Sequence, residues 1–141
     1  MSTFNYLKKG FQEPPPDYDF RPMSLAIEKH LTYNKKAGIK YCIGNRQYGE
    51  YVYDMVLQFA IRFQYEPNFS LFWTNSFSHN DYSLPATMDS RILKYLKEME
   101  TLGIFDNSIV FFSHGVRFGK LSLPGDFLEA RLPTFFISIP K

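Results

Sequence analysis

The expected fold is decided by residues 69–119, which read FSLFWTNSFSHNDYSLPATMDSRILKYLKEMETLGIFDNSIVFFSHGVRFG. The stretch opens with the apolar run 69–73, and a second apolar run covers 108–112. Such runs are typical of strands that are buried on both faces. Between them, apolar residues recur every three or four positions over 88–102, which predicts an amphipathic helix. A strand, a helix and a strand in succession predict a parallel βαβ unit with a right-handed crossover.

The segments on either side extend this pattern. Residues 47–65 carry apolar side chains at helical spacing and predict a core helix, and residues 24–33 predict a shorter helix. Residues 34–46 contain two glycines around a short apolar patch and predict a loop. A third buried strand is expected over 132–140. The whole pattern predicts an α/β fold whose strands are mainly parallel.

The first 23 residues differ in character from the rest of the chain. Pro14, Pro15 and Pro16 exclude a helix and favour extended polyproline geometry. Aromatic residues are scattered along this stretch, which favours its lying against an apolar surface. We therefore expect two parts, an extended arm over 1–23 and a folded unit over 24–141.

The composition argues against several classes of protein. The 141 residues are 45% hydrophobic and 18% aromatic, values that favour a packed core over a disordered chain. A net charge of +2 is too small to indicate a nucleic-acid partner. No run of about 18 apolar residues indicates a membrane span, and the opening residues lack the apolar centre of a signal peptide. Cys42, the single cysteine, is interpreted as a small buried apolar residue, with a bridge to a partner cysteine as the alternative.

Two histidines follow the strands of the predicted βαβ unit. His79 lies in SFSHND after the first strand, and His114 lies in SHG after the second. Because the carboxyl ends of parallel strands meet at one edge of a sheet, we expect both histidines at one shared site. A polar loop before a helix explains the SFSHND stretch without a ligand, and a solvated rim explains Arg117 and Lys120, which follow His114 in the chain.

Taken together, these motifs resemble the DUF229 family, within the superfamily of alkaline-phosphatase-like and sulfatase-like hydrolases. The resemblance rests on FWTNSFSHND, DSRILKYLKEMETLGIFDNSIVFFS, HGVRFG and the closing RLPTFFISIP. It covers nearly the whole chain in order and corresponds to the later part of the family's domain. It implies a partial three-layer α/β/α sandwich. It also implies hydrolysis of phosphate or sulfate esters with zinc, manganese or calcium as the cation.

The resemblance further implies roles for particular residues. His114 matches the metal-binding histidine that follows a late strand of the family. His79 resembles an upstream histidine that contacts metal or substrate, and Asp81 is expected to support it. Apart from the resemblance, Arg117 forms a basic pair with Lys120 around Gly119 and is expected, from its charge, to meet the anionic group of a substrate.

The sequence departs from the family pattern where catalysis would take place. The Asp of the family's Asp-His pair is missing here, either by deletion or by replacement with Ser113, and a neutral hydroxyl is a poor ligand for these hard cations. The nucleophile and the early metal ligands of the family would lie before Met1. We therefore expect a truncated relative that is catalytically inactive and binds no metal tightly.

Two alternatives remain open. One is a non-enzymatic module that binds an anionic small molecule or a partner protein. The other is a fragment of a full-length secreted hydrolase. The resemblance implies an extracellular location or one in the secretory pathway, whereas the chain as written shows no signal peptide.

Overall fold

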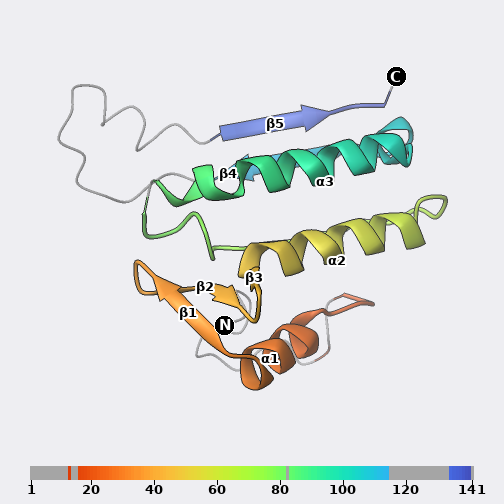
Figure 1. The fold of residues 1–141 in the computed structure, drawn as a ribbon. Coiled ribbons are helices and arrows are strands. Elements are labelled where there is room, and N and C mark those ends of the chain that lie inside the picture. Colours follow the sequence, from red (N-terminus) through yellow and green to blue (C-terminus); the bar gives the residue numbers. More distant parts are fainter. Residues whose placement is uncertain (1–12, 14–15, 82, 115–133, 141) are drawn as a thin grey trace, which may run out of the picture.

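A computed structural model of the chain describes residues 13, 16–81, 83–114 and 134–140 (Figure 1). The α-helices are α1 (Arg21–His30), α2 (Tyr48–Arg62) and α3 (Asp89–Thr101), and the short 3-10 helices are η2 (Leu84–Met88) and η3 (Ile104–Asp106). The strands are β1 (Tyr33–Lys36), β2 (Ile39–Ile43), β3 (Arg46–Gln47), β4 (Val110–His114) and β5 (Thr134–Ser138).

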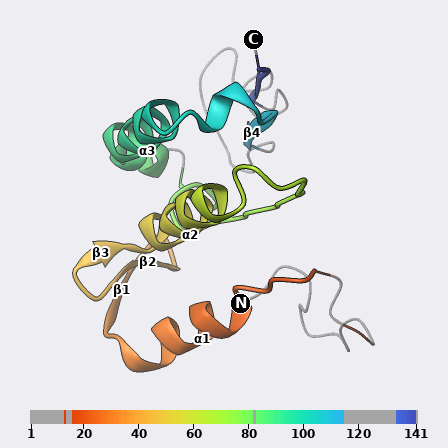
Figure 2. The same ribbon diagram turned by 90° about the vertical axis from the view of Figure 1, so that its right-hand side faces the viewer.

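The helices α2 and α3 lie side by side and run in the same direction, with α1 below them (Figures 1 and 2). Strands β1, β2 and β3 form one antiparallel sheet in that order, next to the start of α2. Strands β4 and β5 form a separate antiparallel ribbon. The described chain is thus a helical layer flanked by two small sheets.

The prediction of a mainly parallel, partial three-layer α/β/α sandwich is wrong. Every strand pair in the described ranges is antiparallel, and the strands form two short sheets. The parallel βαβ unit is absent from these ranges because residues 69–73 form no strand. Phe69 and Trp73 are 89% and 61% exposed, whereas Phe72 packs against Phe20 and Phe59. The run is apolar because one of its faces packs on an aromatic cluster, not because it lies inside a sheet.

The predicted loop over 34–46 is also wrong, because this segment forms most of the first sheet. Strands β1 and β2 are joined at Ala37 and Gly38, whose φ angles are 49° and 81°. Two positive φ angles in a two-residue connection match the twist of an antiparallel hairpin. Asn-Gly is the usual signal for such a turn, and alanine rarely adopts this conformation. The hairpin therefore carries no strong signal in the sequence.

All three predicted helices form, but one has the wrong bounds. The core helix expected over 47–65 is α2, and the helix expected over 88–102 is α3. The helix expected over 24–33 is α1, which runs from Arg21 to His30, because Tyr33 already belongs to β1. Gln47 begins α2, where its backbone N–H donates to Glu50 Oε1 at 3.1 Å, as in a capping box. Gly103, with a φ of 71°, follows the end of α3. The two later strands also form, as β4 and β5, but they pair with each other in antiparallel fashion.

Most of the buried apolar side chains in the described ranges form two clusters, and Ile43 and Met55 are buried outside them. The first joins the first sheet to η2, and the second joins α2 to α3. The members of the first are Tyr41, Phe77, Leu84 and Met88, and those of the second are Leu57, Met99 and Ile104. This division leaves the β4–β5 ribbon outside both clusters.

Part of the proposed arm packs on the helical layer. The ring of Tyr18 lies 5.0 Å from that of Phe63, and Phe20 lies 6.3 Å from Phe59, both on or next to α2. Most of residues 1–23 lie outside the described ranges, so an arm over 1–23 and a separate unit over 24–141 stay predictions. Within the part of the chain described, no helix is long and apolar enough to cross a membrane.

Candidate functional site

The segment that contains His79 is anchored by its first two residues. Ser76 is 5% exposed and Phe77 is 8% exposed, and Phe77 belongs to the first core cluster. The Phe77 ring lies close to the backbone of α2. This close approach depends on Gly49, because a Cβ built there would lie 2.8 Å from Phe77 Cδ1. Burial of Phe77 thus fixes where the polar residues 78–81 emerge at the surface.

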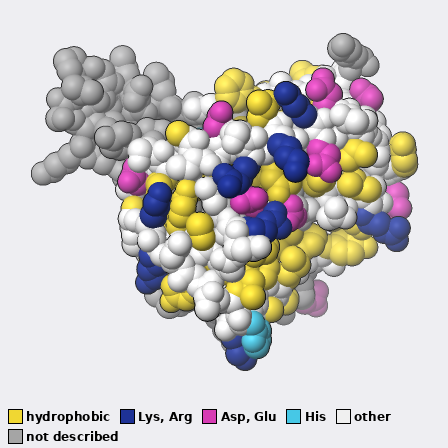
Figure 3. All heavy atoms as spheres, viewed as in Figure 1, with side chains coloured by type: hydrophobic (Ala, Val, Ile, Leu, Met, Phe, Trp, Pro, Cys, Tyr) yellow, Lys and Arg dark blue, Asp and Glu magenta, His cyan; other side chains and the backbone are white. Residues whose placement is uncertain are grey.

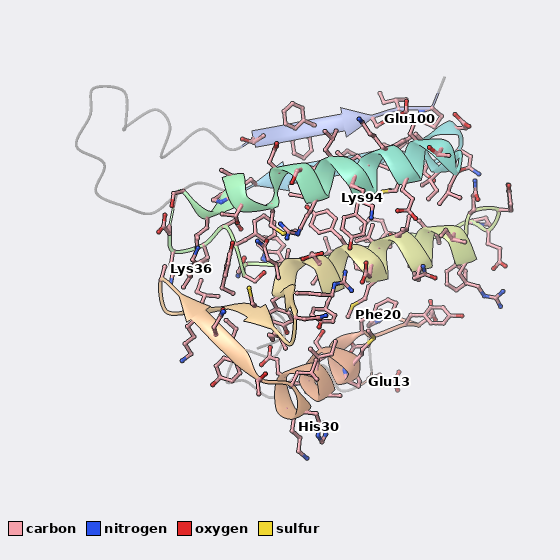
Figure 4. All side chains as sticks on the ribbon, viewed as in Figure 1. Glu13, Phe20, His30, Lys36, Lys94 and Glu100 are labelled. Atoms are coloured by element: carbon pink, nitrogen blue, oxygen red, sulfur yellow. The ribbon has the colours of Figure 1, made fainter. Side chains whose placement is uncertain are left out.

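His79 and Asn80 connect this segment to the β1–β2 hairpin. The His79 Nδ1 atom lies 2.5 Å from Asn80 Oδ1, and Asn80 Nδ2 donates to the carbonyl oxygen of Ala37 at 2.8 Å. Both side chains are exposed. Lys36 precedes this turn, and its Nζ lies 4.7 Å from the centre of the Tyr41 ring (Figure 4). The hairpin tip therefore brings a cation to the surface that holds His79.

Asp81 shapes the turn that leads into η2. Its Oδ1 accepts hydrogen bonds from the Ser83 backbone N–H at 2.8 Å and from the Ser83 hydroxyl at 2.7 Å. These two hydrogen bonds, aided by the charge of Lys36, lower the pKa of the Asp81 carboxyl below its ordinary value. The carboxylate is thus engaged in holding the turn.

His114 brings the end of β4 to the same segment. It pairs with Thr134 of β5 and is the last residue of β4, so it lies within the strand and not after it as the sequence predicts. Its Nε2 atom lies 3.3 Å from the carbonyl oxygen of Ser78, the residue before His79. The structure therefore brings together the two segments that carry His79 and His114. Arg117, the remaining predicted residue, lies outside the described ranges.

The described part of the chain gathers no set of metal ligands around His114. The Nε2 atom of His114 faces a carbonyl oxygen, and an Nε2–H that donates there leaves the lone pair of Nδ1 as the one through which this ring could bind a metal. Ser113 lies on the exposed, opposite face of β4, since adjacent residues of a strand alternate. Among the residues described, no three His, Cys, Asp or Glu side chains gather closely enough to hold a metal ion. The expected role of His114 as a metal ligand stays a prediction.

A second polar cluster, which the sequence analysis missed, joins β3, α2 and α3. Arg46 Nη1 donates to Asp54 Oδ2 at 2.6 Å, and the Tyr95 hydroxyl donates to Asp54 Oδ1 at 2.5 Å. Glu50 pairs with Arg91 at 3.1 Å. Burial alone would raise the pKa of Asp54, but the hydrogen bonds from Arg46 and Tyr95 outweigh it and lower that pKa. Because these charges are matched, the cluster is a structural link between the elements.

Charges of both signs are interleaved over α2 and α3 on the face seen in Figure 3.

Lys36 and Asn80 come from segments far apart in the chain, and neither has neighbours in the sequence that indicate a shared site. Only the tertiary fold brings the hairpin tip to the segment 78–81.

The comparisons with known proteins give one match. A family model with the description "Protein of unknown function (DUF229)" matches residues 1–141. No curated protein and no solved structure matches the chain.

Proposed function

The chain belongs to the family described as "Protein of unknown function (DUF229)", and we propose that it recognises a small oxyanion, such as a phosphate or sulfate monoester, without hydrolysing it. On this proposal the chain corresponds to the later part of a domain related to the alkaline-phosphatase-like and sulfatase-like hydrolases. The binding surface consists of Lys36, His79 and His114, and we call it the anion surface.

The observation that supports this proposal is the contact between His114 Nε2 and Ser78 O at 3.3 Å. It places one imidazole beside the residue that precedes His79, while Asn80 ties the same segment to the hairpin of Lys36. Imidazolium and ammonium groups form charge-assisted hydrogen bonds with oxyanions. Arg117, which follows His114 in the chain, is proposed as a further anion contact.

The proposed lack of hydrolysis rests on the donor set. Metal-dependent ester hydrolysis needs a cation that activates a nucleophile and neutralises the developing oxyanion. Ser113 offers a neutral hydroxyl, and it points away from the face that carries His114. We propose that the anion binds without the zinc, manganese or calcium ion implied for active relatives. Asp81 then acts by shaping the turn next to His79.

A second candidate, association with a partner polypeptide or with the rest of a larger domain, is favoured by one face of the β4–β5 ribbon. The register places Phe111 opposite Ile137 and Ser113 opposite Phe135, so all four side chains share a face. The rings of Phe111 and Phe135 are 5.9 Å apart. The large apolar residues of this face, Phe111, Phe135 and Ile137, are at least half exposed, and so are Ile109 and Ile139, which flank the two strands. Exposed apolar patches of this kind mark interaction sites.

We also propose that the protein resides outside the cell or in the secretory pathway, as the resemblance implies. The anion surface is compatible with either compartment. Residence there is tested by tagging the endogenous protein and locating it by fractionation.

Calorimetric titration of the chain with phenyl phosphate and phenyl sulfate tests the proposed function. We expect saturable binding that Lys36→Ala weakens roughly tenfold, about 1.4 kcal/mol. Lys29→Ala, on the exposed side of α1, is the matched control and should leave binding unchanged. Ester hydrolysis that rises on addition of zinc, manganese or calcium would contradict the non-hydrolytic part of the proposal.

A further inference from the structure

Asn68 begins the only Asn-x-Ser/Thr tripeptide in the sequence, Asn68-Phe69-Ser70. This tripeptide is the acceptor pattern for N-linked glycosylation, provided that the middle residue is not proline. Neither Phe69 nor Leu71, which follows Ser70, is proline. Sequence alone makes such a tripeptide a weak signal, and a second requirement is that the folded chain can accommodate a glycan at this position.

The fold places Asn68 on an exposed, non-helical segment. α2 ends at Arg62, and Pro67 keeps the chain from continuing as a helix. Residues 65–71 are all exposed, and none of them lies in a helix or strand. Figure 1 shows the chain turning at the far end of α2, away from the β1–β2 hairpin. A glycan attached here would extend into solvent from the end of the helical layer.

The surroundings of Asn68 are nevertheless well defined. Gln64 Nε2 donates to the carbonyl oxygen of Leu102 at 2.9 Å, and Asn107 Nδ2 donates to that of Gln64 at 2.7 Å. These bonds fix the end of α2 against the end of α3. Asn68 Nδ2 donates to the carbonyl oxygens of Phe63 and Glu66 at 3.0 and 2.9 Å.

A glycosylated Asn68 is compatible with this geometry. The glycosidic bond replaces one of the two N–H groups of Nδ2 and leaves the other to donate to Phe63 or Glu66. The carbonyl that loses its partner lies in an exposed turn, where water can replace the bond. Modification therefore leaves no buried polar group unpaired.

We propose that Asn68 is an acceptor of an N-linked glycan when the chain enters the lumen of the secretory pathway; this rests on the localisation proposed above. The donor is a lipid-linked oligosaccharide diphosphate. A bond forms between Asn68 Nδ2 and the anomeric carbon of the first sugar, and the bond from that carbon to the diphosphate oxygen breaks. The lipid diphosphate leaves with the electron pair, and the amide gives up one proton.

The test uses the full chain behind a cleavable signal sequence, expressed in cultured animal cells. Delivery to the lumen then does not depend on where the natural protein resides. We expect a band shifted by one glycan, which peptide N-glycosidase removes while converting Asn68 to aspartate in the mass spectrum. Asn68→Gln and Ser70→Ala should abolish the shift, and Ser70→Thr should retain it. Asn45→Gln, an exposed asparagine outside any such tripeptide, is the matched control.

A chain that has lost its signal sequence and is protected from added protease, yet carries unmodified Asn68, would overturn the proposal. Folding of the variants is not required for this reading, since the transfer takes place on the emerging chain. If the fused chain is glycosylated and the endogenous protein stays outside the lumen, the acceptor assignment is supported and the proposed localisation fails. The two proposals therefore fail separately.

Discussion

The Nε2 atom of His114 lies 3.3 Å from the carbonyl oxygen of Ser78, a residue 36 positions earlier in the chain. This contact joins the end of β4 to the polar segment 78–81. It requires Phe77 to be buried, because that side chain fixes the position of Ser78. The candidate site thus depends on packing around α2 as much as on the histidines.

Gly49→Ala should destabilise the protein and disturb this contact. A Cβ at this position would meet Phe77 Cδ1 at 2.8 Å and Met88 Cε at 3.3 Å. Overpacking of this kind typically costs about 1–3 kcal/mol, more than the roughly 1 kcal/mol that alanine gains over glycine in a helix. Urea unfolding measures the difference, with Gln58→Ala on the exposed side of α2 as control. A more stable Gly49→Ala variant would contradict this prediction and show that the Phe77 ring can move away from the new Cβ at little cost.

Ala37→Asn should stabilise the β1–β2 hairpin. Ala37 has a φ of 49°, a left-handed conformation that costs a residue with a Cβ about 1–2 kcal/mol and that asparagine tolerates better. We expect a gain in the free energy of unfolding of about 0.5–1 kcal/mol. Ala37→Val should have the opposite effect, because β-branched residues rarely adopt this conformation. Equal stabilities of the two variants in thermal unfolding would contradict the assigned turn.

Asp54→Asn should reduce the free energy of unfolding at neutral pH. In this variant the free energy of unfolding should also fall less steeply as the pH is lowered. The lowered pKa of Asp54 means that the folded state favours the carboxylate. Its contribution is present above the unfolded pKa and disappears as the pH falls through the folded pKa. Because the side chain is 39% exposed, the expected loss is small, about 0.5–1 kcal/mol.

Urea unfolding at pH 7 and at pH 3 measures this effect. Asp17→Asn, in the exposed segment before α1, is the control. If the free energies of unfolding of the parent chain and of Asp54→Asn differ as much at pH 3 as at pH 7, the cluster around Arg46 does not stabilise the protein through the charge of Asp54.

The apolar ribbon face should cause self-association or dye binding when the chain is isolated. Replacing Phe111 and Phe135 together by threonine should reduce both, since it removes the two contacting rings and keeps a β-branched residue in each strand. Tyr65→Thr, a change at an 87% exposed aromatic residue away from the ribbon, is the matched control. Light scattering and fluorescence of a hydrophobic dye measure the effect. Unchanged light scattering and dye fluorescence in the double variant would show that this face causes neither the self-association nor the dye binding.

The sequence predicts the helices well and the sheets poorly. α2 and α3 show long periodic patterns and clear ends, so local physics determines them. The run 69–73 is as apolar as a buried strand, but its Phe72 packs on Phe20 and Phe59 while its other face stays exposed. Strand direction also depends on the partner strand. β4 pairs with β5, and no local feature of either segment indicates an antiparallel pairing.

Two of the three residues of the anion surface can be anticipated from the sequence. His79 and His114 stand out because polar residues follow apolar runs. Lys36 and the hairpin that carries it do not stand out, because alanine at position 37 is not a residue that indicates a tight turn. Asp81 could be noticed from the sequence, but its hydrogen bonds to Ser83 assign it a structural role in the turn.

The most direct test of anion recognition follows the three imidazoles separately by NMR. His79 and His114 belong to the anion surface, whereas His30 lies at the end of α1 and points away from the hairpin tip of Lys36 (Figure 4). The Cε1–H signals of all three are recorded while phenyl phosphate is added. Assignment uses His30→Gln, His79→Gln and His114→Gln.

We predict that the signals of His79 and His114 shift together and saturate with one binding constant, while the signal of His30 does not move. His79→Gln should weaken the response of His114, and His30→Gln should leave both unchanged. If all three signals move alike without saturation, or if none moves, the chain has no anion surface at the junction of β4 with the segment 78–81.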